Sequence, residues 1–476
     1  MGEKETDILA PLINGAEDDR RRHPTAETRL RRWLWIDREE AKEQVLLSVP
    51  MILTNVCYYF IPLVSVMFAG HLGDAELAAA NLANSWAYVT GFALMVGLSG
   101  ALETLCGQGY GAKLYNMLGI HLQASCIISF IFTVFVSILW WHSDIILTKL
   151  HQDPFISKAA CLYLKHLIPG LFAYGFLQNI LRFLQMQSIV FPLVLGSLIP
   201  LFIHIGITYV LVHWTFLGFK GAALAASTSL WISVLILSIY VLRSRRFEQT
   251  WSGFSLESFR FVFDNLKLAL PSAAMVCLEE CAFELLVLLA GLLPNPKLNT
   301  SLIAMCVNTQ AICYMFAYGL GAAASTRVSN ELGARNPDRA RHAMTVALKL
   351  TVFLALAVVL AMAFGHNIWA GFFSDSDVIK QAFSTMTPFL VISISCDFLQ
   401  GILSGVTRGC GWQHFGLWVN LATFYLIGMP ISLLLCFWLK LYAQGLWIGL
   451  ICGLSSQTVC LLLVTKFTKW TSINLS

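Results

Sequence analysis

The chain has 476 residues, of which 57% are hydrophobic and 12% are charged, and its net charge is +4 with a mean hydropathy of +0.70. Because a soluble domain carries about 25% charged residues, this chain has too few charges to cover a surface that faces water. The composition therefore excludes a soluble enzyme, a nucleic-acid-binding protein and a disordered protein, and the spread of apolar residues along the chain excludes a single-pass receptor.

The first 41 residues form a polar segment that differs from the rest of the chain. Residues 1–32 are rich in charge and lack an apolar run, so we predict a cytosolic tail and not a cleaved signal peptide. Residues 29–35 combine arginine with tryptophan, which is typical of a helix lying among lipid headgroups. The same residues also fit a positive stop before the first membrane span, and both interpretations stay open.

Long apolar segments follow the tail, each with about the 20 residues that a transmembrane helix needs. They are too long and too evenly apolar to be the short, alternating strands of a membrane barrel. The sequence therefore predicts an all-α membrane protein with twelve transmembrane helices. The predicted spans are 42–69, 77–102, 117–141, 158–184, 190–213, 218–242, 264–292, 300–326, 340–372, 379–406, 415–438 and 442–466.

Lysine and arginine predict which side each turn faces, because the cytosolic turns of membrane proteins are enriched in them. With the N-terminus inside, 24 of the 31 lysines and arginines lie on the inner side, and these include every arginine. We therefore expect a cytosolic linker at 243–263 and cytosolic C-terminal residues at 471–476. The plasma membrane and the vacuolar membrane both suit this orientation.

The predicted spans repeat with an offset of about 222 residues, which divides them into two sets of six. Residues 47–50 (LSVP) match residues 268–271 (LALP), and residues 176–181 (FLQNIL) match residues 398–403 (FLQGIL). Because six is an even number, both sets enter the membrane from the same side and form parallel repeats. We predict an N-lobe at 42–242 and a C-lobe at 264–470, with a cleft that opens to each side in turn.

Carboxyl groups are concentrated in the predicted spans of the C-lobe. Glu279, Glu280 and Glu284 lie in the seventh span, and Asp397 lies near the middle of the tenth. A carboxyl at that depth loses hydration, which favours its protonated form, and its charged form would attract an organic cation. Competition between a proton and a cation for one site is the simplest antiport mechanism. The alternative is a carboxyl that stays paired with a neighbouring polar group.

Neutral polar and aromatic residues in the spans either line the cleft or bridge two helices, which is the commoner role of amides in membranes. The thirteen cysteines show no spacing suited to zinc, and the sequence contains no phosphate-binding loop. We therefore expect no metal or cofactor, with a proton gradient as the driving force and sodium as the less favoured alternative. The cleft candidates are Asn55, Gln178, Asn308, Gln310 and Tyr314, together with Glu280.

Short motifs spread over residues 40–470 occur together in one known family. They are AGHLG at 69–73, VTG at 89–91, LCGQGYGA at 105–112, CLE at 277–279, ASTRVSNELGA at 324–334 and GCGWQ at 409–413. With these motifs the chain resembles the multidrug and toxic compound extrusion (MATE) family, and PNP at 294–296 resembles its plant, DETOXIFICATION-type branch.

The resemblance implies two six-helix lobes, alternating access and export of organic compounds driven by protons or sodium. It implies a proton site on Glu279 and Asp397, with Glu284 as a secondary acid. The acid that bacterial members often carry in the first helix has no counterpart here, so we expect no cation site in the N-lobe. Glu280-Cys281 stands where the family usually has aromatic residues, which leaves the pocket shape and the substrate open.

The preferred function is a proton-coupled antiporter that exports organic cations, xenobiotics or plant metabolites and acts as a monomer. One alternative is a lipid or oligosaccharide flippase, although the N-lobe lacks the charges that a headgroup cavity would need. Another is an intramembrane enzyme that uses Glu, Asp and His as acid and base, but no nucleophile, metal or cofactor motif accompanies them. The expected partners are small cationic or amphipathic substrates, protons and membrane lipid, with no nucleic acid.

Overall fold

The computed structural model describes residues 37–150, 152–373 and 376–471, and all regular secondary structure within these ranges is helical. Most of the predicted tail, with its basic and tryptophan-containing segment, lies outside these ranges, and so do residues 472–476. Residues up to 43 and residues from 44 onward form two separate units. The packing described below therefore concerns the larger unit alone.

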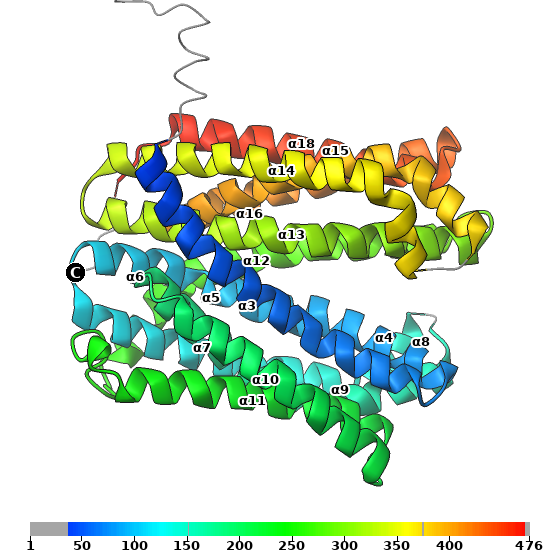
Figure 1. The fold of residues 1–476 in the computed structure, drawn as a ribbon, viewed down its shortest axis with the longest axis horizontal. Coiled ribbons are helices and arrows are strands. Elements are labelled where there is room, and N and C mark those ends of the chain that lie inside the picture. The colour runs from blue at the N-terminus through cyan, green and yellow to red at the C-terminus, as the bar shows by residue number, and fades with distance from the viewer. Residues whose placement is uncertain (1–36, 151, 374–375, 472–476) are drawn as a thin grey trace, which may run out of the picture. The chain divides into compact units, whose positions relative to one another are not determined.

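Twelve long helical segments lie within the described ranges, divided here into a first half before the linker 244–257 and a second half after it (Figure 1). The first half contains α3 (Arg38–Gly70), the run α4 (Asp74–Ala87), η1 (Tyr88–Phe92), α5 (Ala93–Ser99) and α6 (Ala101–Gly111), then α7 (Tyr115–Trp141), α8 (Ser143–Lys149), α9 (Pro154–Met186), α10 (Phe191–Tyr209) with η2 (Val210–Trp214), and α11 (Phe219–Arg243). The linker contains η3 (Arg245–Phe247). The second half contains α12 (Ser258–Ala290), α13 (Pro296–Gly333), α14 (Pro337–Phe373), α15 (Asp377–Cys410), the run α16 (Gln413–Asn420), η4 (Leu421–Gly428), α17 (Met429–Leu433) and η5 (Leu434–Trp438), and α18 (Tyr442–Phe467).

Each predicted span coincides with one of these segments, which confirms the all-α fold class. Among the described residues, eleven segments are long and apolar enough to cross a membrane. The twelfth, α12, has the length but carries Glu279, Glu280 and Glu284 close together. Helices suit such spans because a bilayer offers no water, so every backbone N–H and C=O must be paired within the segment.

Several segments deviate from regular α-helix near their middle. Pro271 lies inside α12 and Pro388 inside α15, where each removes a backbone hydrogen bond and favours a bend. The eleventh segment contains the π-helical stretches η4 and η5, and η4 packs against α12. Because π-helical turns often lie at functional sites, these contacts direct attention to α12.

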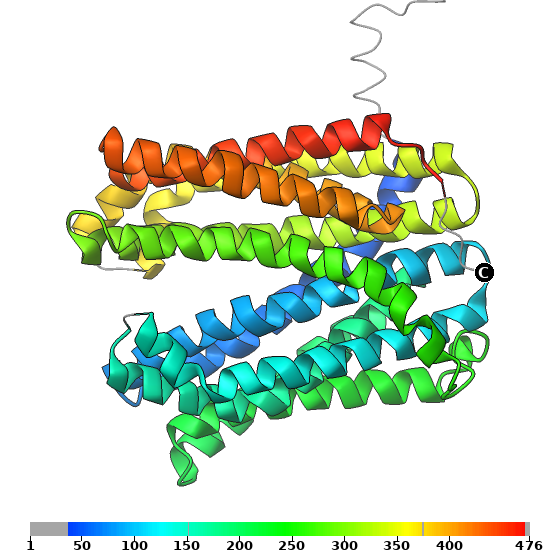
Figure 2. The same cartoon turned by 180° about the vertical axis from the view of Figure 1, so that it is seen from behind.

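Buried hydrophobic side chains form two large clusters. The first draws on helices of the first half and includes Ala269 and Ala273 from the beginning of α12. The second consists of second-half residues and includes Ala282 and Leu286, further along α12. α12 therefore packs with the first half at its beginning and with the second half at its end, a course that Figure 2 shows clearly.

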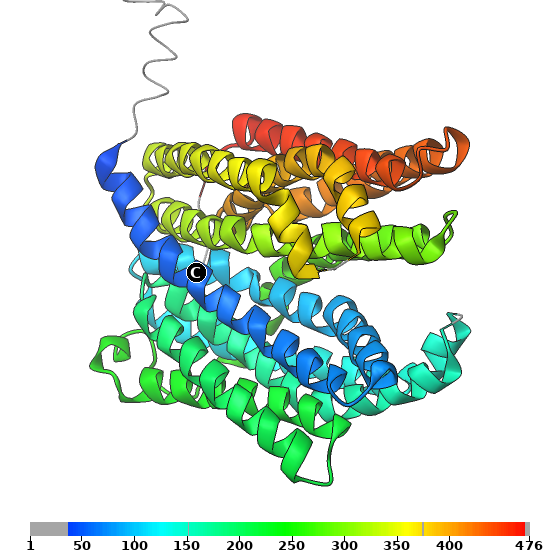
Figure 3. The same ribbon diagram turned by 45° about the vertical axis from the view of Figure 1, so that its right-hand side comes forward.

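α3 crosses between the halves in the complementary way (Figure 3). Met51, near its beginning, packs with Ala322 and Ala323 of α13. Ile61 and Ala69, further along, belong to the cluster of the first half. The beginning of α3 thus packs with the second half, and the beginning of α12 packs with the first half. In this sense the beginnings of the two helices are exchanged between the halves.

Matching side-chain amides hold the beginnings of both crossing helices. Asn265 Nδ2 of α12 donates a hydrogen bond to the carbonyl of His121 in α7 at 2.9 Å. Gln44 Nε2 of α3 donates to the carbonyl of Ala343 in α14 at 2.8 Å. His121 and Ala343 are separated by about 222 positions, the offset of the internal repeat, so the repeat relates the two contacts.

α6 and α13 cross closely near the linker end, which is the end of the bundle that carries the linker 244–257. A Cβ on Gly111 would lie 1.9 Å from the carbonyl oxygen of Asn330, and a Cβ on Gly333 would lie 2.1 Å from that of Gln108. The same offset of about 222 relates these two contacts. The helices approach this closely because neither glycine carries a side chain.

Candidate functional site

The three acids of α12 face two different groups of residues, as their spacing on a helix requires. Glu279 contacts polar side chains of α15 and α16 in the second half. Glu280 and Glu284, one turn apart, contact η1 and α4 of the first half. α12 therefore presents carboxylates to both halves, in the region where it passes from one hydrophobic cluster to the other.

Glu279 and Asp397 are bridged by the side-chain amide of Gln400. Gln400 Nε2 donates to Glu279 Oε1 and, at 3.1 Å, to Asp397 Oδ1. Asp397 is only 2% exposed, and Gln310 Nε2 donates to its other oxygen at 2.9 Å. Ser404 Oγ donates to Gln400 Oε1 at 2.8 Å, which fixes the orientation of the bridging amide. These residues form the carboxylate site.

Buried amides of α16 and α18 support the carboxylate site on the Glu279 side. Asn420 Nδ2 donates to the carbonyl of Met275 at 2.9 Å and lies 3.5 Å from Glu279 Oε2. Gln457 Nε2 in turn donates to Asn420 Oδ1 at 2.8 Å. The amide beside Glu279 is thereby held by two other helices.

A serine and a tryptophan support the site on the Asp397 side. Ser393 Oγ donates to Gln310 Oε1 at 2.7 Å, and Trp447 Nε1 donates to Ser393 Oγ at 3.0 Å. Trp447 and Ser393 are fully buried. Gln310 is therefore oriented so that its NH₂ group points toward Asp397.

Glu280 and Glu284 take their hydrogen bonds from the other half of the protein. Tyr88 Oη of η1 donates to Glu280 Oε1 at 3.2 Å. Ser85 Oγ of α4 lies 3.4 Å from Glu284 Oε1. Among the described residues, Glu280 and Glu284 thus share no hydrogen-bond partner with the carboxylate site, although one helix carries three of the four carboxyls.

Two of the neutral candidates from the sequence lie at the carboxylate site. Gln310 contacts Asp397 directly. Tyr314 lies one turn further along α13 and packs against Gly401 of α15, where a Cβ would come within 3.2 Å of the ring. α13 and α15 thus line the site with an amide and an aromatic ring.

No hydrogen bond among the described residues joins the other three candidates to the carboxylate site. Gln178 is buried in α9, and Asn308 is exposed on α13. Asn55 Nδ2 is buried on α3 without a hydrogen-bond partner in the described part of the chain. Their assignment to the cleft stays a prediction.

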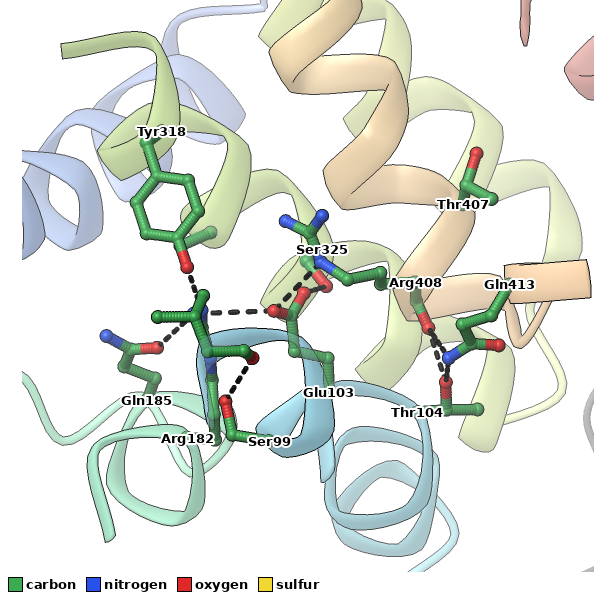
Figure 4. A network of polar contacts seen from close by, with 12 residues as sticks. Ser99, Glu103, Thr104, Arg182, Gln185, Tyr318, Ser325, Thr407, Arg408 and Gln413 are labelled. Atoms are coloured by element: carbon green, nitrogen blue, oxygen red, sulfur yellow. Dashed lines mark hydrogen bonds and ion pairs between the residues drawn. The ribbon is translucent and has the colours of Figure 1, made fainter. Parts of the chain in front are cut away.

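A buried ion cluster near the linker end was not singled out from the sequence (Figure 4). Glu103 Oε1 of α6 lies 3.0 Å from Arg408 Nε of α15 and 3.4 Å from Arg182 Nη1 of α9. Ser325 Oγ of α13 donates to Glu103 Oε2 at 2.6 Å, and Arg182 donates to the hydroxyl oxygen of Tyr318. We call Glu103, Arg182 and Arg408 the linker-end ion cluster.

The carboxylate site offers groups suited to a proton or a single small cation. Its two acids are accompanied by three side-chain amides, which can accept or donate hydrogen bonds as the charge changes. Across residues 37–150, 152–373 and 376–471, no three His, Cys, Asp or Glu side chains gather closely enough to hold a metal ion.

Comparison with known proteins gives one consistent result. The family model described as MatE matches residues 50–210 and 271–434. The chain is 61% identical to Protein DETOXIFICATION 18 of Arabidopsis thaliana over 438 residues, which are 92% of this chain and 93% of the relative. A crystal structure of the eukaryotic MATE transporter AtDTX14 is similar with a TM-score of 0.88 and 40% identity, over 91% of this chain and 96% of that one. An outward-facing multidrug resistance MATE transporter has a similar fold, with a TM-score of 0.81 and 19% identity over 90% and 95% of the chains.

Proposed function

Because this chain belongs to the multidrug and toxic compound extrusion (MATE) family of transporters, we propose that it exports small organic compounds from the cytosol in exchange for protons. The chain is an integral membrane transporter and not an enzyme. The proposed substrates are organic cations, xenobiotics or secondary metabolites of cationic or amphipathic character, carried by a monomer without a cofactor.

The observation that carries this proposal is the single amide between Glu279 and Asp397. Gln400 donates to both carboxylates, and Asp397 is almost fully buried. Two ionised carboxylates so close together repel each other, and burial strengthens the repulsion. A proton or a cation relieves it, so the two can replace each other at this site.

The course of α12 supports coupling between the carboxylate site and movement of the halves. Glu279 lies between the part of α12 that packs with the first half and the part that packs with the second. A change of charge at Glu279 alters its bonds to α15 and α16, and the same helix reaches into the first half. Rocking of the two halves about such a helix is the motion that alternating access requires.

We propose that the linker end faces the cytosol and that both termini are cytosolic. The support is the distribution of charge, since 24 of the 31 lysines and arginines belong to segments that the sequence assigns to the cytosolic side, the linker among them. The protein then exports across the plasma membrane or into the vacuole. Glu280 and Glu284, which face hydroxyl groups of the other half, are proposed to contact the substrate on its way, with Glu284 as a secondary proton acceptor.

The test is transport of a fluorescent organic cation in proteoliposomes of known orientation. We expect a pH gradient alone to drive transport, and expect Glu279→Gln and Asp397→Asn to reduce it to the level of empty vesicles. Asp264→Asn is the matched control, because Asp264 also lies on α12 but forms an exposed pair with Lys267 at 2.8 Å. Glu284→Gln should lose only part of the rate.

Two results would contradict the proposal. Transport driven by a sodium gradient alone would mean that the carboxylates bind a metal ion. Unchanged pH-driven transport in both Glu279→Gln and Asp397→Asn would mean that the proton site lies elsewhere. Folding of each variant is checked by its thermal unfolding midpoint, so that a lost protein is not mistaken for a lost site.

A further inference from the structure

The linker-end ion cluster joins the two halves through one shared carboxylate. Glu103 Oε1 contacts Arg182 of its own half and Arg408 of the other half, at 3.4 and 3.0 Å. The side chains of Glu103, Arg182 and Arg408 are 0%, 3% and 6% exposed. The proposed proton site does not use this cluster, although the cluster joins three buried charged groups across the boundary between the halves.

Glu103 lies where the repeat brings equivalent positions together. Ser325, which donates to Glu103 at 2.6 Å, is its counterpart in the second half, 222 positions later. The close contacts of Gly111 and Gly333 lie on the same pair of helices, α6 and α13. The carboxylate of Glu103 therefore lies at the pseudo-symmetry axis that relates the two halves. A rocking motion first opens or closes the contacts between the halves at this axis.

The cluster is costly to break, and the cost falls unevenly on its members. If the halves part at the linker end, Glu103 keeps Arg182, because α6 and α9 belong to the same half. Arg408 loses its ion pair with Glu103, and Arg182 loses the hydroxyl of Tyr318 on α13. Removing one partner of a buried pair is strongly unfavourable unless water or another acid replaces it.

We propose that Glu103, Arg182 and Arg408 form a latch that holds the linker end closed while the opposite end admits the substrate or the proton. The inference rests on the proposed alternating access, and it adds positioning residues that lie outside the carboxylate site. Arg408 is the decisive member, because its bond to Glu103 connects ionised groups of the two halves. Tyr318 assists by accepting a hydrogen bond from Arg182 across the same boundary.

The experiment is hydrogen–deuterium exchange of the whole protein in lipid nanodiscs, without substrate and without a gradient. Arg408→Gln removes the charge from the second half and leaves Glu103 paired with Arg182. We expect exchange of the backbone amides at 101–111 and 325–333 to become about tenfold faster, since each 1.4 kcal/mol lost from closure raises the open population tenfold. Lys267→Gln is the control, because it removes a lysine from an exposed pair within one helix.

A second variant keeps the inference testable if Arg408→Gln does not fold. Tyr318→Phe keeps the ring and removes only the hydroxyl, so we expect a smaller acceleration confined to the same two segments. The latch is disproved if folded variants exchange at the rate of the unsubstituted protein, or if exchange in α18 accelerates equally, which indicates general destabilisation. Because this measurement needs no transport, its failure is distinguishable from failure of the proposed proton coupling.

Discussion

Substitution of Gly333 by alanine tests whether the crossing of α6 and α13 is as tight as the structure indicates. A Cβ at this position would lie 2.1 Å from the carbonyl oxygen of Gln108 and 2.8 Å from its Cα. Both are backbone atoms, so no side-chain rotation can make room. Ordinary contact requires more than 3 Å, so one helix must move away from the other by about 1 Å.

The expected cost follows from overpacking of a closely packed contact. Forcing one methyl group into such a place costs about 1–3 kcal/mol, which exceeds the gain of up to about 1 kcal/mol that alanine brings to a helix in place of glycine. We therefore expect Gly333→Ala to lower stability. Gly333 is the last residue of α13. Gly365→Ala is the control, because Gly365 belongs to the long helix α14 and nothing would lie within 4 Å of its Cβ.

Thermal unfolding followed by the intrinsic fluorescence of the fourteen tryptophans measures both variants. Gly333→Ala should lower the unfolding midpoint, whereas Gly365→Ala should leave it unchanged or raise it. An unchanged midpoint in Gly333→Ala, or an equal decrease in both variants, would refute the reasoning. The close approach of α6 and α13 would then have no specific effect on stability.

Three further substitutions test the groups around the site and one helix end. Gln400→Leu removes the amide that donates to both carboxylates and should slow pH-driven transport at least about tenfold, the effect of losing about 1.4 kcal/mol, as measured by initial rates in proteoliposomes. Trp447→Phe removes the donor to Ser393 and should cost about 1 kcal/mol of stability, seen as a lower unfolding midpoint. Asp153→Ala removes the side chain that caps α9 and should cost about 1 kcal/mol, with faster hydrogen exchange confined to the first turn of that helix.

The sequence predicted the helices well because the length of an apolar segment is a local property. It predicted their ends less well. The predicted span 300–326 lies inside α13, which extends to Gly333. The added turns contain polar residues such as Glu331, which pairs with Arg327 along the helix at 3.7 Å. Hydropathy detects the membrane-facing part of a helix and not its continuation beyond the membrane.

The acids of the carboxylate site were visible in the sequence because charge is rare in apolar spans. Glu279 and Asp397 could be singled out by depth alone, but their shared partner could not. Gln400 occupies the position of Gln178 in the repeat, and only Gln178 attracted attention. The role of a buried amide depends on the acids that surround it, and the sequence does not show which helices become neighbours.

The linker-end ion cluster was beyond sequence analysis for the same reason. Glu103 and Arg408 are 305 positions apart, and each lies near the end of a predicted span, where charge is ordinary. Arg182 has the same inconspicuous place in the fourth span. Only the repeat offset between Glu103 and Ser325 offered a signal, because equivalent positions of two parallel repeats can meet at the line that relates them.

The exchanged beginnings of α3 and α12 have a consequence for biogenesis. When the ribosome has completed α11, the first half still lacks Ala269 and Ala273, which fill part of its hydrophobic cluster, and Asn265, which pairs with the carbonyl of His121. It can mature only after α12 has been inserted, and the beginning of α3 must wait longer for α13 and α14. Two fragments cut within the linker should therefore assemble when produced together, whereas each fragment alone should be recognised by quality control as unfinished.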